Sequence, residues 1–172
     1  MFKLWRYWMT KEKETFAEML TNKQGHANGI VELGKKIFNK SDYTLAAILK
    51  LLDDQVLPAV DKEWAEELTQ KLKEDLLNKL GDDGVLIFPS APMVAPYHYS
   101  FFLRPFNFAY WGIFNVLRVP SVQVPLGLNS DGVPIGIQVV SAANNDGLCL
   151  AVAAHLEKIF GGYVPPCKVY HR

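Results

Sequence analysis

Three short apolar runs separated by glycine and proline dominate the second half of the chain. The first, Val85–Phe88, follows Asp-Asp-Gly and is ended by a proline, as expected of a short strand buried on both faces. The other two, Ser121–Leu126 and Pro134–Ser141, are joined by an Asn-Ser-Asp-Gly segment whose residues suit a tight turn. They are therefore expected to pair as a hairpin. An aromatic-rich helix over Phe106–Val116 is predicted between the first strand and this hairpin.

The first 81 residues are expected to be mainly helical. Thr10 and Ser41 each precede a helical pattern, and their hydroxyls are suitable N-caps. A third pattern begins at Asp61 and places an apolar residue at every fourth position. It stops at Gly81, where a left-handed C-terminal cap is expected.

Residues 82–164 then predict the order strand, helix, hairpin, helix. Asn144 or Asn145 is expected to cap the last helix, and Gly161 and Gly162 to end it. This order indicates an α/β fold in layers. Three short strands are too few for a complete sheet of this kind. The expected fold is therefore a partial α/β/α sandwich, a fragment of a mixed sheet with covering helices.

Composition and charge exclude several classes of function. The chain carries 18 basic and 18 acidic residues, so its formal net charge is zero and nucleic acid is not an expected partner. Cys149 and Cys167 form no CxxC pair, and no His/Cys spacing suits zinc, so no metal site is expected. Two reduced thiols fit an intracellular protein. No run approaches the ~20 apolar residues of a membrane-spanning helix.

Few residues are candidates for catalysis. The chain has no GxSxG nucleophile elbow and no glycine-rich phosphate loop, and no cofactor is expected. Ser90 lies at a strand end between two prolines, where positioning of substrate or bonding to local backbone is favoured over a role as nucleophile. His98 is interpreted as a solvent-facing or stacked loop residue.

A cluster of aromatic residues is the strongest candidate for ligand binding. Core packing is the simplest interpretation, and the alternative is that several of these rings line an apolar pocket for a lipid chain. The candidate substrate-binding residues are Phe101, Phe102, Phe106, Phe108, Tyr110, Trp111 and Phe114. Separately, the aromatic and basic residues of Trp5–Trp8 suit a membrane interface, so a membrane surface is a further candidate partner.

Several segments taken together are specific to one family. They are Gly81–Val85, Pro89-Ser90, Val94–Pro96, Arg104–Tyr110, Pro125–Asn129, Ile137–Val140, Asn145-Asp146 and Leu156–Gly162. This series resembles the C-terminal third of the amidase signature family, most closely its fatty-acid amide hydrolase 2 group. The resemblance implies an α/β/α sandwich and hydrolysis of fatty acid amides by two serines and a lysine. It also implies an apolar channel for the acyl tail.

None of those three catalytic residues matches a position in this sequence. The family's Gly-Gly-Ser-Ser-Gly-Gly stretch is not among the 172 residues. The resemblance therefore implies that residues 1–172 are the C-terminal part of a single amidase domain, inactive alone. Its implied partners are the N-terminal part of that domain and a lipid amide substrate. The alternative is a non-catalytic module, derived from an amidase, that binds a lipid or a partner.

Overall fold

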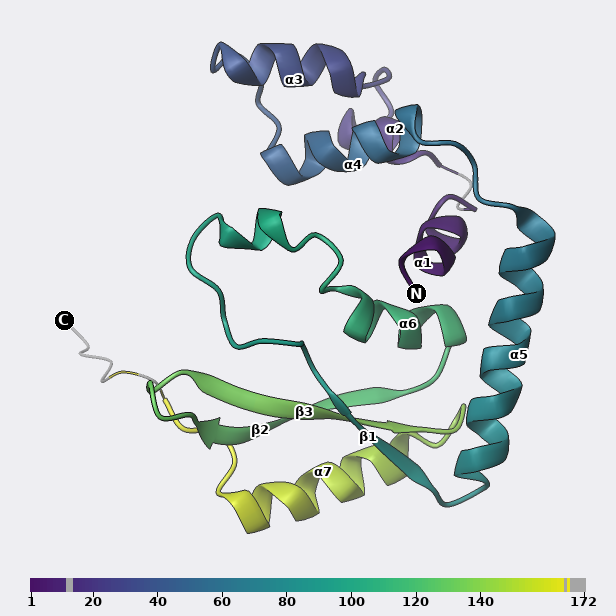
Figure 1. The fold of residues 1–172 in the computed structure, drawn as a ribbon, viewed down its shortest axis with the longest axis vertical. Helices are drawn as coiled ribbons and strands as arrows, with labels where there is room; N and C mark the ends of the chain where they lie inside the picture. The colour runs from purple at the N-terminus through teal and green to yellow at the C-terminus, as the bar shows by residue number, and fades with distance from the viewer. Residues whose placement is uncertain (12–13, 166, 168–172) are drawn as a thin grey trace. The chain divides into compact units, whose positions relative to one another are not determined.

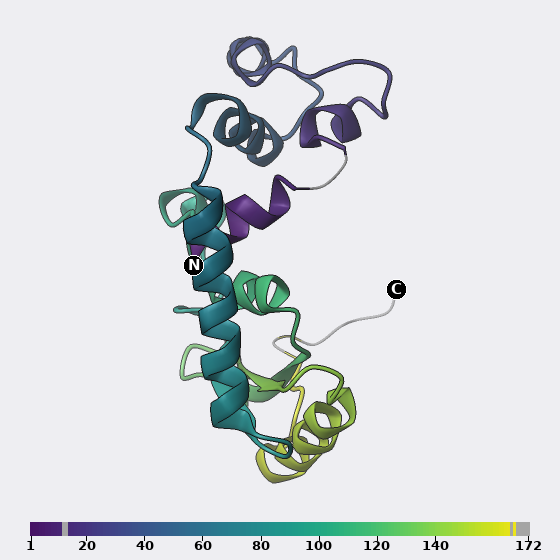
Figure 2. The same ribbon diagram turned by 90° about the vertical axis from the view of Figure 1, so that its right-hand side faces the viewer.

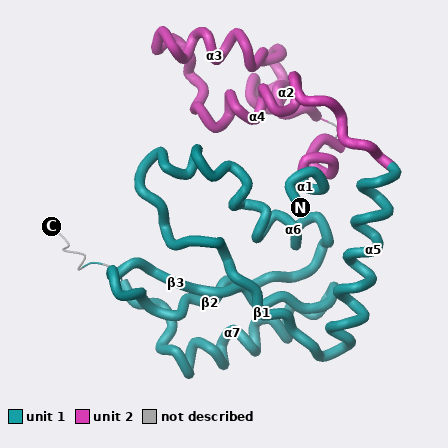
Figure 3. The backbone as a smooth tube through the Cα atoms, viewed as in Figure 1, with its two compact units in different colours: residues 1–5, 63–172 teal, residues 6–62 magenta. Residues whose placement is uncertain are grey.

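The computed structural model describes residues 1–11, 14–165 and 167, which form two compact units (Figure 3). The first comprises residues 1–5 and 63–172 and is called the sheet unit here. The second comprises residues 6–62 and is called the helical unit.

The sheet unit is built on three antiparallel strands. They are β1 (Val85–Pro89), β2 (Ser121–Leu128) and β3 (Pro134–Ser141), in the order β1-β3-β2. The predicted hairpin is confirmed, since β2 pairs with β3. Gly132 lies in its turn at a φ of +75°, a conformation that side chains with a Cβ rarely adopt.

Two helices lie on opposite faces of this sheet, α6 (Ala109–Leu117) on one and α7 (Asp146–Phe160) on the other (Figure 1). The arrangement confirms the predicted α/β class and its partial α/β/α layering. Alternate strand residues pack beneath α7, where Val124, Val139 and Cys149 are fully buried together. This cluster is the apolar core between the sheet and α7.

Aromatic contacts hold the segment around α6. The Phe88 ring on β1 lies 5.7 Å from the Tyr110 ring and 5.4 Å from the Phe114 ring. Before α6, the Phe108 ring lies 4.6 Å from the ring of Trp5, which belongs to α1 (Phe2–Met9). The helix begins at Ala109, not at Phe106 as predicted, because the preceding residues form successive turns that direct their rings toward α1.

A long helix, α5 (Lys62–Leu80), leads into β1 (Figure 2). It ends as predicted at Gly81, whose φ is +60°. Gly84 then turns the chain so tightly that its amide donates to the Leu80 carbonyl. A Cβ at this position would lie 2.1 Å from that carbonyl oxygen, so the connection requires glycine.

The helical unit contains α2 (Phe16–Leu20), α3 (Gly29–Ile37) and α4 (Leu45–Val56). Helices α3 and α4 pack side by side (Figure 1). The buried cluster of this unit is small and consists of Ala17, Ala27 and Leu51.

Both predicted N-caps of the helical unit are wrong. Thr10 follows α1, and the cap of α2 is Thr15, which forms a reciprocal capping box with Glu18. The cap of α4 is Thr44, three residues after the predicted Ser41. Ser41 instead donates to the Glu32 carboxylate.

A buried arginine completes the helical unit. Arg6 is 8% exposed, and its Nε lies 3.3 Å from Oδ2 of Asp53. Its guanidinium also donates to the carbonyls of Asp53, Leu57 and Pro58 at 2.8–3.0 Å. The Asp53 carbonyl lies in the last turn of α4, Leu57 caps the helix and Pro58 follows it, so Arg6 places a positive charge at the negative end of α4.

Candidate active-site wall and its hollow

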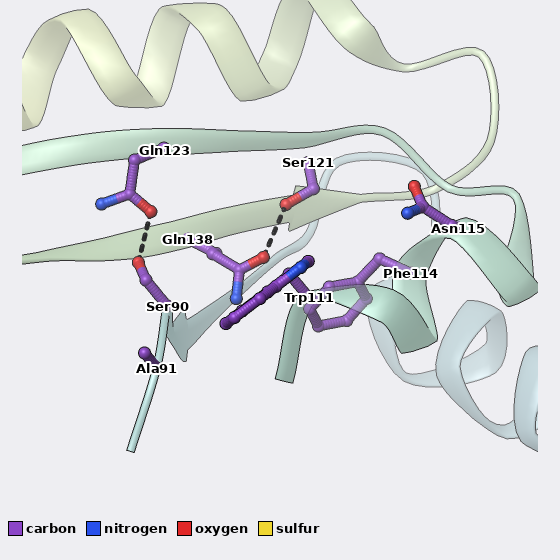
Figure 4. Close-up of a pocket in the computed structure, with 8 residues that line it drawn as sticks. All are labelled: Ser90, Ala91, Trp111, Phe114, Asn115, Ser121, Gln123 and Gln138. Atoms are coloured by element: carbon purple, nitrogen blue, oxygen red, sulfur yellow. Dashed lines mark hydrogen bonds between the residues drawn. The ribbon is translucent and has the colours of Figure 1, made fainter. Parts of the chain in front are cut away.

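A hollow of about 440 Å³ lies between α6 and the sheet face opposite α7 (Figure 4). The end of β1, helix α6 and strands β2 and β3 all contribute to it. Its lining residues are Ser90, Ala91, Trp111, Phe114, Asn115, Ser121, Gln123 and Gln138. Successive side chains of a strand point to opposite faces of the sheet. The strand residues next to those that face α7 therefore point into the hollow.

One buried carboxamide forms the floor of the hollow. Gln138 on β3 is 5% exposed, and its Nε2 donates to the carbonyls of Pro89 at 3.0 Å and Tyr110 at 3.2 Å. Its Oε1 accepts a hydrogen bond from Ser121 Oγ at 3.3 Å. A single side chain thus joins β3 to β1, α6 and β2 and holds the walls of the hollow together.

A second carboxamide lies at the rim. Ser90 Oγ donates a hydrogen bond to Oε1 of Gln123 on β2 (Figure 4). The Gln123 side chain crosses β3 at Gly136, where an added Cβ would lie 2.3 Å from Nε2. The same Cβ would lie 2.6 Å from the backbone carbonyl oxygen of Val124, so glycine is required at that position. The partner of Ser90 is a distant side chain, not the local backbone considered in the sequence analysis.

Two of the seven aromatic candidates line the hollow. Trp111 is 47% exposed at its edge, whereas Phe114 is buried between the hollow and β1. The structure places the other five elsewhere. Tyr110 packs on Phe88, Phe106 on Phe2, Phe108 on Phe2 and Trp5, and Phe101 on Phe102. Binding of a lipid chain by these residues stays a prediction.

Sequence reasoning missed the two glutamines and Asn115. Gln123 and Gln138 are polar residues inside otherwise apolar strands, which is the signal that could have identified them. Each glutamine lies on the strand face opposite Val124 and Val139. The register of the hairpin pairs Gln123 directly with Gln138, so the two side chains lie next to each other once that register is known.

The hollow carries no ionisable group among its described lining residues. His98 and His155 are both exposed outside it, on a loop and on α7 respectively. In the parts of the chain that the structure describes, no group of three or more His, Cys, Asp or Glu residues could hold a metal ion. The arrangement is chemically suited to binding neutral polar groups beside an aromatic wall.

Altered pKa values occur in the helical unit. Hydrogen bonds from the backbone and side chain of Thr15 hold the pKa of Glu18 below its ordinary value. Hydrogen bonds from Lys35 and Ser41 lower the pKa of Glu32, and the same carboxylate raises the pKa of Lys35. These shifts belong to a helix cap and to an ion pair between the buried Glu32 and the half-exposed Lys35, and they do not mark a second site.

Comparison with known proteins identifies the family. The model of the family described as Amidase matches residues 4–150. The chain belongs to the amidase family. Human fatty-acid amide hydrolase 2 is 43% identical to it over 97% of the chain. Fatty-acid amide hydrolase 2-B of Danio rerio is 40% identical over 91%. The chain spans about a third of the length of these relatives (33% and 30%).

A solved structure has a similar fold. A protein from a vestigial complex, related to the origins of an s-triazine catabolic enzyme, superposes with a TM-score of 0.59. The match covers 78% of the present chain and 31% of the solved chain, at 20% identity. At that identity the likeness concerns the fold alone.

The structure also bears on the predicted membrane contact. None of the described helices has the length and apolar character needed to cross a bilayer. Within Trp5–Trp8, the Trp5 ring packs on Phe108 and Tyr7 is buried. Contact of this segment with a membrane surface stays a prediction.

Proposed function

We propose that this chain is the C-terminal portion of a serine hydrolase that cleaves the amide bond of fatty acid amides. The observation that carries the proposal is its 43% identity with human fatty-acid amide hydrolase 2 along almost the whole chain. Because the match covers only 33% of that relative, hydrolysis by this chain is part of the proposal.

In this proposal the attacking serine belongs to polypeptide outside this chain. A serine nucleophile needs a neighbouring base to take its proton. Ser90 donates to the carboxamide of Gln123, and Ser121 donates to that of Gln138. A carboxamide oxygen accepts a hydrogen bond but does not accept a proton near neutral pH. These two serines therefore suit a structural or substrate-facing role, and the hollow forms one wall of the complete cavity.

The aromatic residues take the acyl tail in this proposal. Trp111 offers an exposed apolar surface at the edge of the hollow, and Phe101 and Phe106 are about half exposed on the preceding segment. Apolar and aromatic surfaces of this kind are typical of pockets that bind lipid chains. Their exposure is a reason to expect an occupant, either an acyl chain or further polypeptide of the domain.

Complementation tests the proposal. The chain would be assayed with oleamide, alone and after refolding with the N-terminal two thirds of human fatty-acid amide hydrolase 2. We expect no turnover by the chain alone. We expect turnover by the mixture, abolished by a serine-directed fluorophosphonate. Hydrolysis by the chain alone that disappears in Ser90→Ala or Ser121→Ala would contradict the proposal, as would an inactive mixture whose parts demonstrably associate.

A second candidate is a non-catalytic lipid-binding or partner-binding module. It is favoured by a hollow whose walls are already tied together by Gln138 within this chain. This candidate predicts saturable binding of a fatty acid amide with no hydrolysis in any combination of chains. The complementation assay therefore separates the two candidates.

A further inference from the structure

We propose that the hollow discriminates by charge, accepting a neutral carboxamide and rejecting the ionised carboxylate of the same acyl chain. The inference rests on the proposed function and deepens it. Hydrolysis breaks the C–N bond, adds the hydroxyl of water to the acyl carbon and a proton to the nitrogen. The acid formed then loses its proton near neutral pH. Discrimination of this kind would retain the substrate and release the product.

The described lining of the hollow carries no charged side chain. Its described residues are two carboxamide glutamines, an asparagine, two serines, an alanine and two aromatics. A carboxylate leaving water is stabilised by a cation or by several aligned donors. The lining supplies no cation, and the aromatic wall formed by Trp111 and Phe114 removes water from one side of any occupant. A neutral carboxamide has a far smaller desolvation cost.

The hydrogen-bonding groups around the hollow complement a carboxamide better than a carboxylate. The Ser90 hydroxyl proton is directed at Gln123, so its remaining oxygen lone pairs present an acceptor to an occupant. The Gln123 and Asn115 amide groups present donors as well as acceptors. A carboxamide has N–H donors and a carbonyl acceptor and can match both. A carboxylate has acceptors only, so it would oppose the Ser90 oxygen.

The floor of the hollow is already held in place by hydrogen bonds within the chain. Gln138, which would otherwise be an adaptable donor, uses Nε2 on two backbone carbonyls and Oε1 on Ser121. Turning its NH₂ group toward an anion would leave the carbonyls of Pro89 and Tyr110 without that donor. The floor therefore does not rearrange to compensate for a negative charge.

Paired probes of equal length test the inference without any hydrolysis. Octanamide and octanoate would be titrated near neutral pH into the 172-residue chain at sub-micromolar concentration. Binding would be followed by tryptophan fluorescence. The contribution of Trp111 would be obtained by subtracting the emission of the Trp111→Phe variant from that of the wild type. We expect octanamide to bind with a Kd about tenfold lower than octanoate. We expect Gln123→Lys to reverse that order, because it places a cation at the rim.

Asn115→Lys is a second variant at the same rim, and Gln70→Lys on α5 is a matched control outside the hollow. Circular dichroism would verify that each variant is folded. The first two are expected to shift the preference toward octanoate, and the control to leave it unchanged. Equal affinities in the wild type, or no saturable change with octanamide in a folded chain, would overturn the inference. Because no hydrolysis is measured, this failure is distinct from failure of the complementation assay.

Discussion

The interiors of the two units are built from different kinds of side chain. The sheet unit buries an apolar cluster of Val124, Val139 and Cys149 between two strands and α7. The helical unit has only a small apolar cluster, and it adds the buried guanidinium of Arg6 and its ion pair with Asp53. The polar side chains named above therefore have different structural roles in the two units. In the helical unit the Arg6 guanidinium completes the interior, whereas in the sheet unit Gln123 and Gln138 lie on the face that forms the hollow.

The largest effect is expected at Arg6. Arg6→Met removes one partner of the mostly buried Asp53 carboxylate, which also lies 3.8 Å from Nζ of Lys50, and the donor to the carbonyls of Asp53, Leu57 and Pro58. Loss of one partner of a buried ion pair is expected to lower the free energy of unfolding by about 3 kcal/mol. Urea unfolding followed by circular dichroism would measure the change.

The control for Arg6 is Lys23→Met, which removes an exposed ion pair with Glu14 in the same unit. It is expected to cost no more than about 0.5 kcal/mol, because solvent screens such pairs. Similar losses in the two variants would show that the helical unit does not depend on its buried arginine.

A smaller effect is expected in the core of the sheet unit. Val139→Ala removes two methyl groups from a fully buried position and leaves a small cavity. A loss of about 2 kcal/mol is expected, measured by the same urea titration. Leu150→Ala on the outer face of α7, where the side chain is 60% exposed, is the control and should change little. If Leu150→Ala costs as much, the apolar cluster does not stabilise the unit as described.

The smallest effect is a pH dependence of the helical unit. The pKa of Glu32 is lowered from 4.5 by its hydrogen bonds, so its contribution is present above 4.5 and lost as the pH falls through the folded value. The pKa of Lys35 is raised from 10.5, so its contribution is lost as the pH rises through the folded value. In Glu32→Gln, the free energy of unfolding should therefore depend less on pH at both the acid and the alkaline end of the range.

Glu67→Gln on the exposed side of α5 is the matched control for this titration. It should leave the acid and alkaline limbs of the plot as they are in the wild type. If Glu32→Gln gives the wild-type curve at both ends, the ion pair between Glu32 and Lys35 does not stabilise the folded state.

The sequence predicted the strands and the hairpin because their signals are local. Gly132 and the prolines beside each strand act through their own backbone geometry. The start of α6 was missed because Phe106 and Phe108 pack on residues about a hundred positions earlier in the chain. The hollow was missed for a related reason. Gln123 and Gln138 meet only through the register of β2 and β3, and no local pattern specifies what lies across from either residue.

The candidate aromatic residues show the same limit. Their abundance was visible in the sequence, but which rings share a cavity depends on tertiary contacts. Only Trp111 and Phe114 line the hollow, whereas Phe106 and Phe108 pack against α1. Family membership and layer order were predictable because they depend on several segments together rather than on any single contact.

The central claim is that this chain supplies one wall of a hydrolytic cavity whose nucleophile lies on other polypeptide. Its most direct test is to label the complemented amidase with a fluorophosphonate and locate the modified serine by mass spectrometry. The account predicts a label on the added N-terminal polypeptide and none on this chain. A label on Ser90, Ser121 or any other serine of this chain would contradict it.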